Sequence, residues 1–185
     1  ALVENVEANG RHFTFGIVGS AWLFPALSSA GRGDLALSIL MGDSYPSFGH
    51  MVQQNMTTLC ENWKCEFHDA GGGSQNHIMY GAFDEWMVTG RGGLTVTSNA
   101  SFTGWEHFTV HPDPYAATTR GEGRFSIHTR FGVAAVQWVY DSVTHTVHTN
   151  VTVPVGSSAT VISDQVLPQH GCQLEAVSES GRVIW

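Results

Sequence analysis

The spacing of apolar residues changes period part-way along this 185-residue chain, after the glycine-rich run at residues 89–93. Before this run, apolar residues recur three and four positions apart, as they do on one face of a helix. After it, they alternate with polar residues, as they do on a half-buried strand. The sequence therefore predicts an α+β chain, with helices in residues 1–90 and strands in residues 91–185.

Four helices are expected before the change of period. Apolar residues at helical spacing and N-cap residues place them near residues 17–27, 35–41 and 52–63, and from residue 76 onward. The proposed N-caps of the second and fourth helices are Asp34 and Asn76. In the first helix, Trp22 is expected on the buried face, and Pro25 should kink the helix or mark its first turn. Four helices with such apolar faces need a partner surface. We therefore expect this part to belong to a larger layer of helices rather than to form a closed bundle.

Strands are expected after the change of period. Three runs alternate between apolar and polar side chains, around Phe125, Trp138 and Val151, and the trend continues to Val161. Clusters of Gly, Pro, Asp and Ser separate the runs. Short alternating strands between such clusters are typical of an antiparallel β-sandwich.

The charge of the chain limits its partners. The formal net charge is -8, with only eight Lys and Arg residues. A nucleic-acid surface and an anionic membrane surface both need clustered cations, so neither partner is predicted. The sequence contains no apolar run of about 18 residues that would span a bilayer. Its first residues lack the pattern of a signal peptide and an initiator Met, which suggests a processed or excised piece of a longer protein.

Three sequons point toward the secretory pathway, and the three cysteines are an odd set. The sequons Asn55-Met56-Thr57, Asn99-Ala100-Ser101 and Asn150-Val151-Thr152 are candidate glycosylation sites, and they favour an extracellular glycoprotein. Cys60 and Cys65 are close enough in sequence to form a disulfide, which would leave Cys172 free or paired with another chain. Three unrelated thiols remain the alternative. The histidines show no convincing ligand spacing, so neither a metal site nor a cofactor is predicted.

Residues 57–63, followed one loop later by Asn76 and His77, form the main candidate for a ligand site. Glu61 supplies a carboxylate and Trp63 an aromatic ring. Such rings stack on a sugar face, while carboxylate, Asn and His side chains hydrogen-bond its hydroxyl groups. The simpler interpretation is a surface carboxylate beside core residues.

Six segments keep the order and rough spacing of a known family. They are HFTFGIVG (12–19), LFPALSSAGR (23–32), YPSFG (45–49), TTLCENW (57–63), SQNH (74–77, before Gly81) and GWEHF (104–108). Together they resemble the C-terminal end of the inverting α-L-rhamnosidases, a family of glycoside hydrolases. The resemblance covers most of residues 10–165.

The resemblance implies both a fold and residue roles. The helical part would be the last part of an (α/α)6 barrel, followed by the family's C-terminal β-sandwich. Glu61 matches the general base that activates water. His77, in the pair with Asn76, matches a residue that contacts rhamnose, and Trp63 matches an aromatic residue near the pocket. The partner would be a rhamnose-containing glycan.

The resemblance also implies that the site is incomplete. The family's general acid and its acidic sugar-binding cluster lie upstream of residue 1, so another polypeptide would have to complete the barrel. Cys60 stands where the family commonly has a bulky apolar residue. Two hypotheses therefore remain. The chain is either the C-terminal portion of such a hydrolase, or a non-catalytic carbohydrate-binding or structural glycoprotein on the same scaffold.

Overall fold

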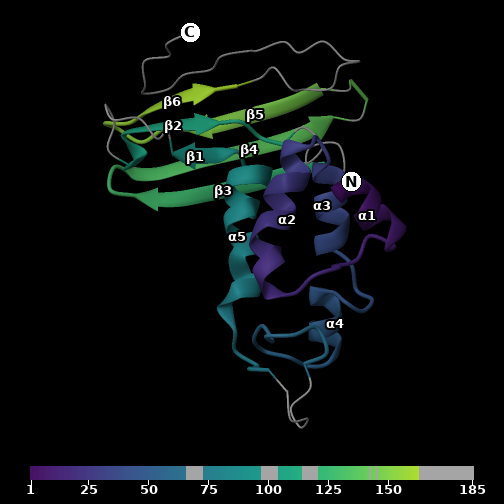
Figure 1. Ribbon diagram of the computed structural model, residues 1–185. Helices are drawn as coiled ribbons and strands as arrows, with labels where there is room; N and C mark the ends of the chain where they lie inside the picture. The colour runs from purple at the N-terminus through teal and green to yellow at the C-terminus, as the bar shows by residue number, and fades with distance from the viewer. Residues whose placement is uncertain (66–72, 97–103, 114–120, 142, 145, 163–185) are drawn as a thin grey trace. The chain divides into compact units, whose positions relative to one another are not determined.

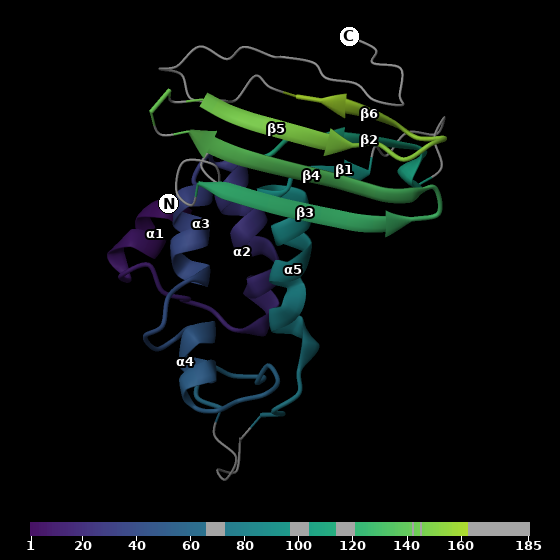
Figure 2. The same cartoon turned by 180° about the vertical axis from the view of Figure 1, so that it is seen from behind.

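The computed structural model describes residues 1–65, 73–96, 104–113, 121–141, 143–144 and 146–162. The chain divides into two compact units, Ala1–Trp86 and Met87–Trp185. The first contains helices, and the second contains the strands (Figures 1 and 2). The predicted boundary after residue 90 falls within η2 (Met87–Arg91), a single π-helical turn at the start of the second unit. None of the described helices is long and apolar enough to cross a bilayer.

The helical unit is arranged around its longest helix, α2. Figures 1 and 2 show α2 between α3 and α5. The elements are α1 (Leu2–Ala8), α2 (Ile17–Ser29), α3 (Gly33–Leu40), α4 (Phe48–Gln53), the 3-10 turn η1 (Ile78–Ala82) and α5 (Phe83–Trp86).

Helix α2 buries one stripe of side chains and leaves another exposed. The buried stripe consists of Ser20, Leu23, Phe24 and Leu27. The prediction that Trp22 belongs to this face is wrong, because its side chain is 74% exposed. A buried stripe on a helix contains only every third or fourth residue. Trp22 lies a quarter-turn or more around the helix axis from these buried positions. Pro25 lies inside the helix, past its first turn.

Aromatic rings form the core between α2 and the later elements of this unit. Phe24 stacks on Trp86 with ring centroids 5.0 Å apart, and Phe13 meets Phe24 edge-on at 5.8 Å. Phe13 also packs against Trp63 at 4.3 Å, which in turn packs against Tyr80 at 4.1 Å. Such contacts add directional preference to the burial of large apolar surfaces. They tie segments far apart in the sequence into one core.

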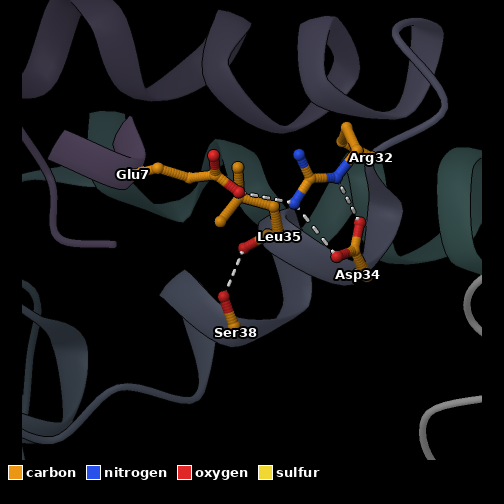
Figure 3. A network of polar contacts seen from close by, with 5 residues as sticks. All are labelled: Glu7, Arg32, Asp34, Leu35 and Ser38. Carbon is orange, nitrogen blue, oxygen red and sulfur yellow. Dashed lines mark hydrogen bonds and ion pairs between the residues drawn. The ribbon is translucent and has the colours of Figure 1, made fainter. Parts of the chain in front are cut away.

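Arg32 joins α1 to the start of α3 (Figure 3). Its guanidinium donates to Glu7 Oε1 at 3.0 Å and to both carboxylate oxygens of Asp34 at 2.9 and 3.2 Å. Burial alone would raise the pKa of Asp34. Hydrogen bonds from Arg32 and from the Leu35 backbone N–H outweigh burial and lower that pKa. Asp34 therefore stabilises the first turn of α3 from within, whereas the sequence predicted it at the N-cap, which is Arg32.

The third and fourth predicted helices differ most from the structure. Helix α4 ends at Gln53. The prediction that the helix continues to residue 63 is therefore wrong for residues 54–63. Asn55 adopts the left-handed conformation with φ 60°, and the next N–H, that of Met56, donates back to the Met51 carbonyl at 3.1 Å. Asn tolerates this conformation and commonly ends helices in this way. The predicted fourth helix is a 3-10 turn followed by a short helix, and its N-cap is His77 rather than Asn76.

The second unit contains two three-stranded sheets. One has the order β1-β2-β6 and the other β3-β4-β5. The elements are β1 (Leu94–Val96), the 3-10 turn η3 (Gly104–Glu106), β2 (His107–Val110), β3 (Glu122–Thr129), β4 (Gly132–Asp141), β5 (Thr146–Thr152) and β6 (Ser158–Val161). The three predicted alternating runs correspond to β3, β4 and β5. All pairings are antiparallel except that of β2 with β6, which is parallel.

The core of the second unit lies between its two sheets. One sheet contributes Leu94, Phe108 and Val110, and the other contributes Ala134, Val136 and Trp138. Successive buried positions on β4 are two residues apart, as the alternating pattern predicts. This arrangement is a β-sandwich, as expected from the sequence.

Candidate active site

Residues 59–61 and 74–77 lie beside one another in the helical unit, joined by backbone hydrogen bonds. The N–H of Glu61 donates to the Ser74 carbonyl at 2.7 Å, and the N–H of His77 donates to the Leu59 carbonyl at 2.8 Å. The Thr58 hydroxyl donates to the Gln75 carbonyl. The structure thus brings two of the predicted site residues, Glu61 and His77, onto neighbouring stretches of chain.

The Glu61 carboxylate is fixed by a backbone donor. The Ser74 N–H donates to Glu61 Oε2 at 2.7 Å, the short distance expected for a hydrogen bond to a charged acceptor. Among the described residues, no hydrogen bond reaches the other oxygen, Oε1. Glu61 is half-buried. One carboxylate oxygen is therefore held in place while the other can accept a proton from water.

Gly73 leaves room for this carboxylate. A Cβ at position 73 would lie 2.8 Å from Glu61 Cβ and 3.0 Å from Glu61 Oε2. Both distances are closer than carbon and oxygen atoms normally approach without rearrangement. Neither Gly73 nor Ser74 was predicted as a site residue, although Ser74 begins the SQNH segment and the glycines before it allow a close approach to another backbone.

A disulfide closes the chain on either side of Glu61. Cys60 and Cys65 are bonded, with Cα atoms 5.5 Å apart, in agreement with the predicted pair. Both are buried. The N–H of Cys65 donates to the side-chain oxygen of Asn62 at 3.1 Å, which closes the turn within the loop. Cys172 lies outside the described residues. The bond limits how far Glu61 can move from the core below it.

His77 presents one ring nitrogen as an acceptor. Its Nδ1 accepts the Met79 N–H at 3.4 Å, capping η1. In a neutral imidazole this contact assigns the proton to Nε2, which has no acceptor among the described residues and can donate to a hydroxyl or carboxylate. Asn76 is exposed, and its backbone N–H donates to the Ser74 hydroxyl at 3.1 Å. Its side-chain role stays a prediction.

Trp63 lies beneath the site rather than in it. Its ring is 8% exposed and packs against Phe13 and Tyr80. Its Nε1 donates to the Phe15 carbonyl at 3.0 Å. These contacts leave little of the ring for stacking on a sugar. The described contacts favour the interpretation of Trp63 as a core residue that anchors the Glu61 segment.

An open apolar hollow adjoins the same segment. Its volume is about 260 Å³, and the residues just before Glu61 contribute Thr57, Thr58 and Leu59 to its lining. The remaining lining residues are Leu40, Phe48, Met51, Val52, Met56 and Phe83. The sequence analysis did not predict this feature, because the hollow depends on α4 ending at Gln53.

The predicted glycosylation sites lie in different surroundings. Asn55 is exposed at the end of α4, and Asn150 is exposed on β5. Asn99 lies outside the described residues. Exposure is required for a glycan, so Asn55 and Asn150 both remain candidates.

Comparison with known proteins identifies the family of both units. Residues 1–90 match the model of the bacterial alpha-L-rhamnosidase 6 hairpin glycosidase domain, and residues 93–181 match that of the bacterial alpha-L-rhamnosidase C-terminal domain. The chain belongs to the α-L-rhamnosidase family. The site described above lies in residues 57–77, within the part of the chain that matches the glycosidase domain.

Similar proteins agree with this assignment. An α-L-rhamnosidase of Streptomyces avermitilis is 29% identical over 143 residues, which are 74% of this chain and 13% of that protein. The solved α-L-rhamnosidase from Dictyoglumus thermophilum has a TM-score of 0.75 at 27% identity, covering 89% of this chain and 18% of that one. The Streptomyces avermitilis α-L-rhamnosidase complexed with L-rhamnose has a TM-score of 0.73 at 25% identity, covering 86% and 15%. The chain thus spans less than a fifth of each relative's length.

Proposed function

We propose that this chain is the C-terminal portion of an inverting α-L-rhamnosidase in which Glu61 is the general base. The observation that carries the proposal is the Glu61 carboxylate, held through Oε2 by the Ser74 N–H within the part that matches a glycosidase domain. A general base in an inverting glycosidase must hold one carboxylate oxygen toward a water molecule. Among the described residues, no hydrogen bond reaches Oε1 of Glu61, which leaves this oxygen available for that water.

The reaction would use two carboxyl groups on opposite sides of the glycosidic bond. Glu61 removes a proton from water, and the water oxygen attacks the anomeric carbon of a terminal α-L-rhamnoside. The general acid, contributed by a region not in this chain, protonates the leaving oxygen. Inverting enzymes keep the two groups roughly 6.5–9.5 Å apart, so that the water fits between base and sugar. His77 donates through Nε2 to a sugar hydroxyl group.

An exposed face of α2 supports the need for a further polypeptide. Val18 and Trp22 lie four residues apart on this helix and are 71% and 74% exposed. Side chains one helical turn apart form a continuous apolar stripe. We assign this stripe to contact with the rest of the barrel. The Cys60–Cys65 disulfide is stable in oxidising surroundings, which supports an extracellular location.

The test uses the longest intact polypeptide or complex that contains the chain. It should release the aryl group from an aryl α-L-rhamnoside, and proton NMR should show β-L-rhamnose as the first product. Glu61→Gln should lower kcat by about 10²–10⁴-fold, with a much smaller change in KM, because general base catalysis contributes on that order. The matched control is Glu85→Gln, which changes an exposed carboxylate of the same unit.

Two results would refute the assignment. If Glu61→Gln hydrolyses the substrate at the parent rate, Glu61 is not the base. If the intact assembly binds rhamnose but hydrolyses no rhamnoside, the non-catalytic interpretation of the scaffold is correct.

A further inference from the structure

Strand β5 presents an edge that is easily extended by another strand. Among the residues that the structure describes, β5 pairs with β4 alone. Its sequence, TVHTNVT, is rich in β-branched residues and contains no proline and no Lys, Arg, Asp or Glu. Segments of this kind add readily to other strands, and proteins usually protect such edges with charge, proline or a cover.

The side chain of Asn150 lies on the outward face of this strand. Val147 and Val151 pack toward the sandwich core, so the alternation of the strand directs Asn150 away from it. Asn150 is exposed and lies opposite Gln137 on β4. Gln137 in turn accepts a hydrogen bond from Arg124 on β3 at 3.1 Å. A row of polar side chains therefore crosses the outer face of the sheet and ends at Asn150.

We infer that Asn150 carries an N-linked glycan, which covers the outer face of β5 and blocks strand addition at its edge. The sequon Asn150-Val151-Thr152 ends with the last residue of the strand, and Thr152 is also exposed. The glycan is bulky and hydrophilic. The inference is independent of Glu61 and of catalysis.

The modification is a glycosyl transfer from a lipid-diphosphate oligosaccharide in the secretory pathway. Asn150 Nδ2 attacks the anomeric carbon of the first sugar. A carbon–nitrogen bond forms, the bond from that carbon to the diphosphate oxygen breaks, and the lipid diphosphate leaves with both bonding electrons. A base of the transferase takes the proton from Nδ2. The polar row from Arg124 through Gln137 offers hydrogen-bonding groups under the first sugars.

The experiment secretes the longest intact polypeptide that contains the 185-residue chain from yeast, and maps its glycans by mass spectrometry. The denatured protein is treated with peptide N-glycosidase in heavy-oxygen water, which converts each glycosylated Asn into labelled Asp. The peptide that contains Asn150 should carry the label. Thr152→Val should abolish it, because the hydroxyl of the sequon is lost while the β-branched shape is kept. Thr149→Val is the matched control, because it removes a neighbouring exposed hydroxyl outside the sequon.

The protective role is measured separately by light scattering at neutral pH. The Thr152→Val protein should aggregate several-fold faster than the wild type, and the Thr149→Val protein at the wild-type rate. Wild-type protein trimmed with an endoglycosidase under native conditions supplies the same comparison without a substitution. Recovery of the Asn150 peptide without label from secreted protein would overturn the glycan assignment. Equal aggregation rates of trimmed and untrimmed protein would overturn the protective role.

Discussion

Strands β3, β4 and β5 follow one another through short turns, whereas the helical unit is held together by segments that are distant in sequence. In this sheet, residue pairs such as Phe125 with Val136 come from consecutive strands, although the other sheet pairs β2 with the distant β6. In the helical unit, Trp63 donates to the Phe15 carbonyl, and Trp86 Nε1 donates to the Ser28 hydroxyl at 2.8 Å. The two regions therefore differ in how far apart in sequence their contacting residues lie. This difference determines whether a substitution affects only its neighbours in sequence or also distant segments.

Long-range anchors make the Glu61 segment dependent on the whole helical core. Residues 54–65 contain no helix or strand of their own. They keep their shape through the disulfide, the buried Trp63 and the backbone hydrogen bonds to residues 74–77. A site on an irregular segment needs such external supports to hold a carboxylate in place. The sandwich carries no comparable segment among its described strands.

The largest effect is expected from removing the buried tryptophan of each unit. Trp86 is 1% exposed in the helical unit, and Trp138 is fully buried in the sandwich. Replacing either by Ala should cost about 3–5 kcal/mol, because it removes apolar contacts and leaves a cavity. Hydrogen exchange should show that Trp86→Ala loosens residues 54–65 along with α2, while Trp138→Ala loosens β3 and β4.

The comparison fails if exchange in residues 54–65 is unchanged by Trp86→Ala, because the aromatic core would then not support the site. Leu2→Ala is a control for substitution in the helical unit, since Leu2 is 37% exposed. Its effect should stay well below that of Trp86→Ala.

The next effect concerns the disulfide. Cys60→Ala combined with Cys65→Ala should lower the free energy of unfolding of the helical unit by roughly 2 kcal/mol, the chain-entropy value for so short a loop. Reductant should shift the unfolding midpoint of the wild type in the same direction. The strands of the sandwich contain no cysteine, so their exchange protection should not respond to reductant. A response there would show that the two units unfold as one cooperative system.

Gly73→Ala tests the contact with Glu61 directly. The new Cβ would meet Glu61 Cβ at 2.8 Å, so the loop or the carboxylate must move. We expect the free energy of unfolding to fall by about 1 kcal/mol, at the low end for overpacking because Gly73 is only half-buried. Gly81→Ala is the control, because the nearest atom to a Cβ there is 3.5 Å away, an ordinary contact. Equal effects of the two substitutions would contradict the close approach.

These differences in contact range also explain how far the sequence alone could predict the structure. Alternation located β3, β4 and β5, because each strand's pattern is fixed by its own residues. The residue pattern selected Glu61 and His77 as candidates, and the resemblance assigned them roles that stay predictions. Helical spacing failed for residues 54–63, since Met56, Leu59 and Trp63 fit a helix but Asn55 ends it in the left-handed conformation. The partners of Glu61 could not be predicted from spacing, because they come from a separate loop.

A smaller, pH-dependent effect is expected at Asp34. Its pKa is lowered in the folded protein, because hydrogen bonds from Arg32 and the Leu35 N–H outweigh burial. The contribution is present above the ordinary pKa of about 4 and is lost as pH falls through the folded value. Asp34→Asn should lower the free energy of unfolding by up to about 1 kcal/mol at neutral pH, as for partly exposed pairs. The loss should vanish in acid. Asp84→Asn, an exposed carboxylate of α5, is the control in urea titrations at both pH values.

The smallest effect, with the opposite sign, is expected at Tyr80. Its side chain is fully buried, and its hydroxyl has no hydrogen-bond partner within the described part of the chain. Tyr80→Phe should therefore leave the free energy of unfolding unchanged or raise it by about 1 kcal/mol, because an unsatisfied buried hydroxyl is removed and the ring contact with Trp63 is kept.

Burial also raises the pKa of Tyr80 to about 12. Between the ordinary value of about 10 and this value, the unfolded tyrosine loses its proton before the folded one, so stability falls as pH rises. Tyr80→Phe should reduce this alkaline loss, which urea titrations at increasing pH would measure. A variant that is less stable than the wild type at neutral pH would show that the hydroxyl has a hydrogen-bond partner. A hydrogen bond from Tyr80 would then help to hold Trp63 and the Glu61 segment in place, in addition to the ring contact.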